Sequence, residues 1–369
     1  MPFNTKSLFS LRSWLFYLEV LAVIGFVVLA ALYIRRGSAD PESPPLSRAG
    51  TFIEKADALF EKQDLVDAAL LYWQALQALE TSGEDQSVPI KGRSQSSSEA
   101  RLHANLRIAE IYSHSSWLKD AKARLEHAAR IQPEHSGVRL LRGKLFRDEG
   151  LLSEATEEFL AVLKQDPHHA EAHYLLGVLY QGSKQYKSAT EYYSSAIEHD
   201  PDLKGISSEK APIGILARLQ LSRTYAKILL DYQFLDREFT DEDLAEVTRL
   251  ESESVRLLEE AHKKYPEMDE VVNDLVRLLF ARAVSLERED IETRQYADAL
   301  RVYERIVELE PREVRALERM GEIYASFLGD KAAALEMYRK VYEVEPHPTV
   351  LANVKSLEED VAAEMASEE

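Results

Sequence analysis

A period of 34 residues runs through the middle of the chain and constrains its fold more than any other feature. Pro133, Pro167 and Pro201 are each 34 residues apart. Three further columns of similar side chains keep the same step: Ala121, Ala155 and Ala189; Tyr112, Phe146 and Tyr180; and Leu125, Phe159 and Tyr193. Several independent columns in one register indicate an array of repeated units, each of which stacks on its neighbours.

Each repeated unit contains two helical patterns, as residues 170–203 illustrate. The first helix is marked by Leu176, Gly177 and Tyr180. The second helix has small or aromatic side chains at steps of three and four residues: Tyr186, Ala189, Tyr193 and Ala196. The second helix is predicted to end at Asp200, because the residue before a proline avoids the α region. We expect the small Gly177 and Ala189 to let the paired helices approach closely.

The repeated unit resembles the tetratricopeptide repeat. The family pattern asks for Leu-Gly, Tyr, Ala, an aromatic residue, Ala and Pro at fixed spacing. Residues 170–203 supply them in order: Leu176, Gly177, Tyr180, Ala189, Tyr193, Ala196 and Pro201. His173 stands where the family has an early Trp. The resemblance implies an all-α fold, a right-handed superhelix of helix-turn-helix units.

The resemblance extends over residues 51–347 and predicts seven units. They lie near 49–80, 102–135, 136–169, 170–203, 215–268, 269–313 and 314–347. The polar stretch 81–101 is expected to be a mobile loop, and an insertion near 285–294 lengthens the sixth unit. In the stretched fifth unit, Thr240 and Asp243 predict a capping box at the start of a long second helix. Residues 348–369 are expected to form a polar closing helix and tail, as the end of a solenoid requires.

An apolar segment at residues 14–34 precedes the repeats, with Glu19 as its one charged residue. At 1.5 Å per residue this segment makes a helix of about 31 Å, close to the hydrocarbon thickness of about 30 Å. Trp14 and Tyr17 near one end and Tyr33 near the other are typical of the membrane interface. We therefore predict a single transmembrane helix at 14–34, with the lipid bilayer as a partner.

A cleaved signal peptide is the alternative interpretation of this segment. Such a peptide has an apolar region of about 7–15 residues followed by a cleavage site of small residues. The uncharged run here ends in Tyr33-Ile34-Arg35-Arg36, a poor cleavage site, which favours a retained anchor. Residues 1–13 then form a tail, and residues 35–50, rich in Pro, Ser and Gly, a flexible tether. Basic residues on the two sides of the span nearly balance, so the orientation stays open.

Charge and composition exclude several classes of function. The formal net charge is −19, and such an acidic surface repels phosphate backbones, so no nucleic-acid partner is expected. The chain has no cysteine, which excludes disulfides, thiolate metal sites and Cys nucleophiles. The sequence also lacks a phosphate-binding Gly loop, a Ser nucleophile elbow and an HExxH motif. We predict neither enzymatic activity nor a cofactor.

His168, His169 and His173 are the strongest candidates for metal ligands. His169 and His173 are four residues apart and could share one face of a helix. A metal site normally needs three or four convergent ligands, and Glu171 points elsewhere at its spacing. We therefore interpret the three histidines as a polar turn followed by a substituted family position. A metal-dependent protein is kept only as a remote alternative.

The resemblance implies that the first helix of each unit lines a concave, partner-binding groove. The groove positions it assigns are Leu106, Leu140, Lys144, Arg147, Tyr174, Val178, Leu219, Arg223, Lys227, Asn273, Arg277 and Phe280. These residues give an apolar middle with a basic edge. Such a groove would suit an extended or helical peptide with apolar and acidic residues. The alternative is that the apolar positions only pack between helices.

The anchor and the resemblance together predict a membrane-anchored scaffold that captures a partner protein. It would serve the assembly or recruitment of a membrane or cell-envelope complex, as in bacterial inner-membrane repeat proteins that it resembles in architecture. We expect the repeats on the periplasmic side, with the cytoplasmic side as the alternative. The second hypothesis is an obligate accessory or regulatory subunit of a membrane enzyme or export machine. A large apolar patch outside the groove would favour that second hypothesis.

Overall fold

The computed structural model describes residues 44–80, 86–115, 117–200, 211–233, 240–288 and 296–368. These residues belong to two compact bodies, residues 1–167 and residues 168–369. The predicted transmembrane helix at 14–34 and the tail before it lie outside the described residues. Among the helices that are described, none combines the length and the apolar character needed to cross a membrane.

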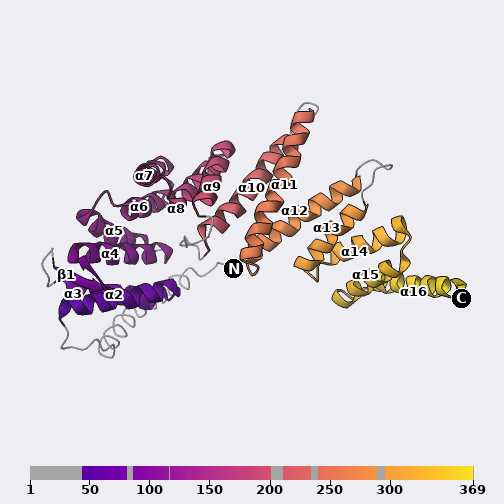
Figure 1. The fold of residues 1–369 in the computed structure, drawn as a ribbon, viewed down its shortest axis with the longest axis horizontal. Coiled ribbons are helices and arrows are strands. Elements are labelled where there is room, and N and C mark those ends of the chain that lie inside the picture. Colours follow the sequence, from indigo (N-terminus) through magenta and orange to yellow (C-terminus); the bar gives the residue numbers. More distant parts are fainter. Residues whose placement is uncertain are drawn as a thin grey trace, which may run out of the picture. The chain divides into compact units, whose positions relative to one another are not determined.

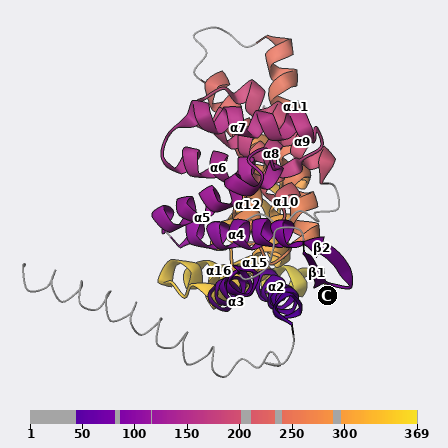
Figure 2. The same cartoon turned by 90° about the vertical axis from the view of Figure 1, so that its left-hand side faces the viewer.

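The first body contains three helix pairs, stacked one above the other in Figure 2. The pairs are α2 (Pro45–Glu61) with α3 (Leu65–Glu80), α4 (Ser97–His114) with α5 (Leu118–Ile131), and α6 (Ser136–Asp148) with α7 (Leu152–Gln165). Within each pair the two helices pack on each other, and α3 packs on α4 and α5 on α6. The core comes from small and branched side chains such as Ala56, Ala68 and Ile108, all fully buried.

Helix α2 begins earlier than the sequence predicted. The flexible tether was expected to reach residue 50, but the helix starts at Pro45, with Pro44 at its N-cap. Proline suits this place because its fixed φ is helical and its missing N–H would have no partner in the first turn. Ala49 and Gly50 are already buried, so the prediction of a tether is wrong for residues 45–50.

A β-hairpin occupies much of the stretch predicted as a mobile loop. Strands β1 (Ser87–Ile90) and β2 (Arg93–Ser96) pair antiparallel, beside α2 and α4 in Figure 2. Lys91 and Gly92 form the turn with φ of 48° and 71°, the left-handed conformation that a two-residue hairpin turn requires. Val88 and Ile90 join a buried cluster with Ile53. The loop prediction is therefore wrong from residue 87 onward, and residues 81–85 lie outside the description.

The second body contains four helix pairs and a closing helix (Figure 1). The pairs are α8 (Ala170–Gly182) with α9 (Tyr186–His199), α10 (Ile213–Gln233) with α11 (Asp241–Lys264), α12 (Asp269–Arg288) with α13 (Tyr296–Leu309), and α14 (Val314–Ile323) with α15 (Lys331–Val344). A π-helical turn, η1 (Tyr324–Leu328), extends α14. Helix α16 (Pro348–Glu368) packs on α15 through Val354 and Leu357.

One contact recurs within the helix pairs: a glycine of the first helix against an aromatic ring of the second. Gly143 meets Phe159, Gly177 meets Tyr193, and Gly321 meets Tyr338. Ala121, Ala155 and Ala189, which share one column of the period, have no exposed surface. Among the described residues, the helices thus form seven consecutive pairs, and the prediction of an all-α array is confirmed apart from the hairpin. The right-handed twist of the superhelix remains a prediction.

Candidate partner-binding surface

Four of the twelve predicted groove residues are buried and unavailable to a partner. Leu140, Tyr174 and Leu219 are 9%, 3% and 1% exposed, because they pack in the interior of their helix pairs. Lys144 on α6 is also buried, with 8% of its surface exposed. The expectation that Lys144 forms a basic edge therefore does not match its place in the fold. At these four positions the structure favours the alternative interpretation, in which the side chains pack between helices.

Three further predicted residues are partly exposed but are not brought together into one site. Leu106 packs against the core of the first body, on α4. Arg147, on α6, forms an ion pair with its neighbour Asp148 at 2.9 Å. Val178 lies half-buried on α8 in the second body. No described contact links these side chains into a common polar or apolar pocket.

The remaining predicted residues meet on the first helices of the second body. Arg223 on α10 donates from Nε to Asp274 on α12 at 2.5 Å, and its Nη2 lies 3.4 Å from Glu270. Arg277, one turn along α12, donates to the same carboxylate of Asp274. Asp274 therefore fixes two arginines from two helix pairs, and this network joins α10 to α12.

An aromatic contact continues this surface to α14. The guanidinium of Arg315 lies over the ring of Phe280, 4.6 Å from its centroid, and the arrangement is a cation–π contact. Phe280 in turn packs edge to face on Tyr303, at 5.8 Å between centroids. We call the exposed set the first-helix surface, which comprises Arg223, Lys227, Asn273, Arg277, Phe280 and Arg315. It spans the first helices of three consecutive pairs.

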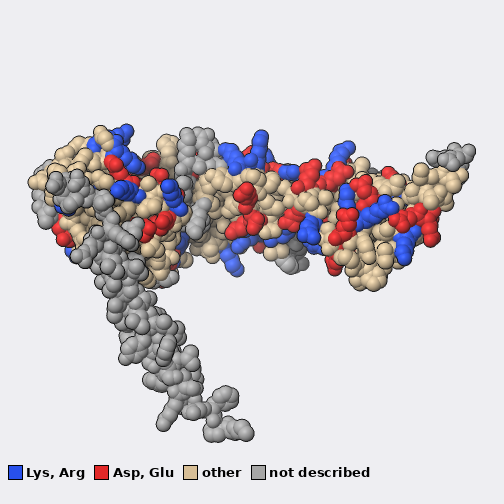
Figure 3. Space-filling model, turned by 90° about the horizontal axis from the view of Figure 1, so that it is seen from below, with Lys and Arg blue, Asp and Glu red and all other residues tan. Residues whose placement is uncertain are grey.

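The charge of the first-helix surface is more balanced than the sequence suggested. Arg223 and Arg277 both pair with Asp274, and Glu270 adds a second carboxylate beside Arg223, so two cations face two anions. Lys227 is the exposed cation of the set that forms no ion pair within the described part of the chain. Figure 3 likewise shows Lys and Arg interleaved with Asp and Glu on the visible face. The surface thus offers alternating charges around an aromatic centre.

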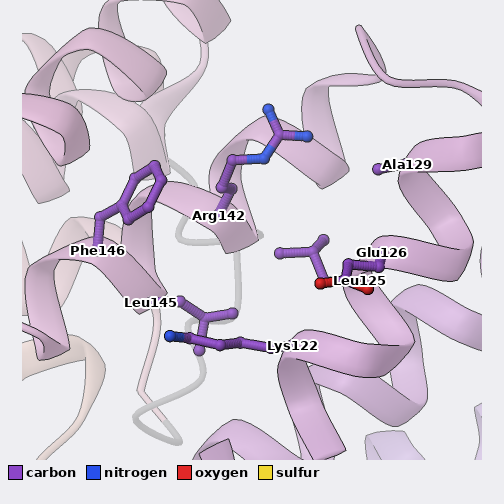
Figure 4. A pocket seen from close by; sticks show the side chains of 7 residues that line it. All are labelled: Lys122, Leu125, Glu126, Ala129, Arg142, Leu145 and Phe146. Atoms are coloured by element: carbon purple, nitrogen blue, oxygen red, sulfur yellow. The ribbon is translucent and has the colours of Figure 1, made fainter. Parts of the chain in front are cut away.

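An apolar cavity in the first body was missed by the sequence analysis. It has a volume of about 240 Å³, and Figure 4 shows the side chains around it: Lys122, Leu125, Glu126, Ala129, Arg142, Leu145 and Phe146. At 100° per residue, Arg142, Leu145 and Phe146 lie on the face of α6 opposite Leu140 and Lys144. Family reasoning that considers only one face of each first helix could not have found it.

The cations that rim this cavity already have partners. Lys122 forms an ion pair with Glu149, and Arg142 lies 2.9 Å from Glu158. The cavity floor is aliphatic and aromatic, with Leu125 and Leu145 nearly fully buried. The cavity can therefore receive an apolar group.

The three candidate metal ligands do not converge. His169 is the N-cap of α8, where its Nδ1 accepts a hydrogen bond from the backbone N–H of Ala172 at 3.2 Å. His168 instead lies 3.3 Å from His199, nitrogen to nitrogen, and the ring of His173 packs beside His199. In the part of the chain that the structure describes, no group of three or more potential ligands could hold a metal ion.

A polar cluster in the first body joins α2, α3 and α4. Asp57 on α2 accepts a hydrogen bond from the hydroxyl of Tyr72 on α3 at 2.6 Å and lies 2.7 Å from Nε2 of His103 on α4. Burial opposes ionisation of Asp57, but His103, Tyr72 and Lys91 together lower its pKa. Burial and the Asp57 carboxylate raise the pKa of Tyr72 above its usual range. The cluster therefore holds an ionised carboxylate against a protonated phenol at neutral pH.

Two stretches of the chain match family models described as the tetratricopeptide repeat, residues 170–203 and residues 288–349. No curated protein matches the chain. The chain is similar to the solved structure of pilF from Pseudomonas aeruginosa, with 14% identity over 71% of this chain and 99% of that one, at a TM-score of 0.42.

Two further solved structures are also similar. One is the C-terminal part of a TPR repeat-containing protein from Cytophaga hutchinsonii, with 13% identity, 82% and 99% coverage and a TM-score of 0.48. The other is a tetratricopeptide repeat protein from Parabacteroides merdae, with 15% identity, 84% and 98% coverage and a TM-score of 0.39. On the family matches, residues 170–203 and 288–349 are similar to tetratricopeptide repeats.

Proposed function

We propose that the chain is a scaffold that binds a partner protein on the first-helix surface. The proposal is supported by contacts that link three successive first helices. Arg223 on α10 and Arg277 on α12 both donate to Asp274 on α12, and the ring of Phe280 on α12 lies under Arg315 on α14. Asp274 holds the two arginines in fixed positions before any partner arrives. Preorganised side chains lose less conformational entropy on binding, which favours affinity and specificity.

The charge pattern selects the kind of partner. Exposed Lys227 favours an acidic residue, while Glu270 beside Arg223 favours a basic one. Phe280, half-buried under Arg315, offers a ring edge to an apolar side chain. A peptide or helical segment with apolar residues and both signs of charge fits better than a purely acidic segment.

The membrane anchor belongs to the same proposal. Residues 14–34 are apolar over the length of a bilayer, and we assign them to a single transmembrane helix. The scaffold would then be anchored in a bacterial inner membrane, with its repeats on the periplasmic side. There it would take part in the assembly of an envelope complex. Anchoring raises the effective concentration of the array near membrane-bound partners, so modest affinity suffices.

An obligate accessory subunit of a membrane enzyme or export machine is the second candidate. The observation that favours it is the apolar cavity between α5 and α6, which lies off the predicted groove (Figure 4). A permanent partner would be expected to cover such a site with apolar side chains. In that case the partner would remain bound through purification at any salt concentration.

The test is partner capture with a matched pair of charge reversals. Arg277 and Arg301 are 69% and 75% exposed at their side chains, and each pairs with an Asp three residues earlier. Arg277→Glu should abolish the recovery of a stoichiometric partner with the detergent-solubilised full chain, and Arg301→Glu should retain it. Equal recovery with both variants would contradict binding at the first-helix surface.

A further inference from the structure

The fifth helix pair and the helix after it are longer than their neighbours. Helices α10, α11 and α12 have 21, 24 and 20 residues. The two preceding pairs, α6 to α9, have helices of 13 or 14 residues. Figure 1 shows the three long helices running side by side. The extra turns give this part of the second body surface that an ordinary repeat lacks.

A second apolar cavity lies among these three helices. It has a volume of about 180 Å³ and is lined by Ala226, Leu229, Leu230, Glu251, Val255, Leu278, Ala281 and Arg282. On each helix the first lining residue is followed by others three or four positions later, so the lining residues form stripes along the helix axes. An engineered cavity of about 150 Å³ admits a benzene-sized group, so this one can receive a large apolar side chain.

The cavity opens to solvent, and none of its lining residues belongs to the first-helix surface. Leu230 is 50% exposed, although it is a large aliphatic residue at the cavity rim. On α10 Leu230 lies two turns beyond Arg223 on the same face, and on α12 Ala281 lies one turn beyond Arg277, so the cavity adjoins that surface. The cavity therefore offers a second place on the second body at which apolar surface is left uncovered.

Two opposite charges flank the cavity on different helices. Glu251 on α11 and Arg282 on α12 both line it, and neither forms an ion pair within the described residues. Burial raises the pKa of Glu251, and the charge of Arg282 only partly opposes this. Glu251 and Arg282 are both exposed, so charged groups of a partner can reach them.

We propose that this cavity binds a helical segment of a partner protein. One Leu- or Met-sized side chain of the segment fills the cavity, a basic residue faces Glu251 and an acidic residue faces Arg282. The stripes along three neighbouring helices suit a fourth, amphipathic helix, whose apolar side chains recur at the same steps. This inference rests on the proposed role of the array in binding proteins, but it names a different site.

The test uses two designed helical peptides and the full chain in detergent. Both peptides carry a leucine stripe at steps of three and four, flanked by one Lys and one Glu, and the second peptide exchanges these two charges. Fluorescence anisotropy of the labelled peptides should show that one charge order binds at least tenfold more tightly. Circular dichroism of the bound peptide should show a helix, whereas an extended bound peptide would overturn the proposal.

Three variants locate the site of peptide binding. Leu230→Ser should weaken binding at least tenfold, while Leu244→Ser, which removes a 59% exposed leucine of α11 outside the cavity, should leave it unchanged. Glu251→Arg combined with Arg282→Glu should invert the preference between the two peptides. Equal affinity for both peptides, no binding of either, or indifference to Leu230→Ser would overturn the proposal.

Failure of this inference and failure of the proposed function are distinguishable. If the peptides do not bind but partner capture still depends on Arg277, only the cavity site is wrong. If one peptide binds at least tenfold more tightly than the other but capture is indifferent to Arg277→Glu, only the first-helix surface is wrong.

Discussion

Gly177 on α8 lies so close to the ring of Tyr193 on α9 that a Cβ atom at this position would be 2.6 Å from the ring. The same relation holds for Gly143 with Phe159 and for Gly321 with Tyr338. A glycine at this position is therefore a packing requirement of these three pairs. It lets the ring of the second helix rest on the backbone of the first.

Gly177→Ala should destabilise the second body because the methyl group must displace the fully buried ring of Tyr193. Overpacking of this kind costs about 1–3 kcal/mol of unfolding free energy. Thermal unfolding followed by circular dichroism measures the change. Gly182→Ala is the control, since no atom lies within 4 Å of the added Cβ and alanine favours the helix. Equal destabilisation by both variants would mean that the ring contact is unimportant.

Asp57→Asn should weaken the first body and change its response to acid. The pKa of Asp57 is lowered in the fold, so its contribution is complete above its ordinary value of 3.8 and is lost as pH falls through the lower folded value. We expect a loss of about 1–3 kcal/mol at neutral pH. The difference from the unsubstituted protein should shrink below about pH 4. Chemical denaturation across pH tests this, with the exposed Glu61→Gln as the control. A difference independent of pH would contradict the account.

Arg319→Ala should be strongly destabilising because it leaves Glu287 without its cation. The Glu287 side chain is 5% exposed and accepts hydrogen bonds from Nε of Arg319 and the hydroxyl of Tyr303, both at 2.7 Å. Removing one partner of a buried pair costs about 3 kcal/mol or more. The exposed Arg301→Ala should cost at most about 0.5 kcal/mol. Urea unfolding measures the loss of stability in both variants. Similar midpoints would show that the ion pair of the buried Glu287 contributes no more to stability than an exposed pair.

Thr240→Ala should lower stability by about 0.5–2 kcal/mol through loss of an N-cap. The hydroxyl of Thr240 accepts from the backbone N–H of Asp243 at 3.2 Å, and Asp243 accepts from the N–H of Thr240 at 2.9 Å. Thr248→Ala, at an exposed position within the same helix, serves as the control. Hydrogen exchange at the start of α11 should rise only in Thr240→Ala, and unchanged exchange would argue against the cap.

Local patterns in the sequence were enough to predict the helix pairs. The expectation that Gly177 lets its helix pair approach closely is confirmed by its contact with Tyr193, and the capping box at Thr240 and Asp243 is confirmed in detail. Such features depend on neighbours a few residues or one helix away. The hairpin was missed because its strands are only four residues long and carry many serines, although Lys91-Gly92 is a turn signal.

The binding surface could not be predicted to the same depth. Arg223 and Asp274 are 51 residues apart, and their ion pair depends on how α10 is placed beside α12. Lys144 was assigned to the edge of the groove by the resemblance to the family, yet only 8% of its surface is exposed. Both cavities also arise from the meeting of several helices, which no single repeat encodes.

We propose that residues 14–34 hold a protein-binding helical array at a membrane. The most direct test is the distribution of the full chain and of a chain lacking residues 1–36 after alkaline washing of membranes. The account predicts that the full chain stays in the membrane pellet, while the shortened chain is found in the supernatant with helical circular dichroism. Release of the full chain into the supernatant, or an unfolded shortened chain, would contradict the account.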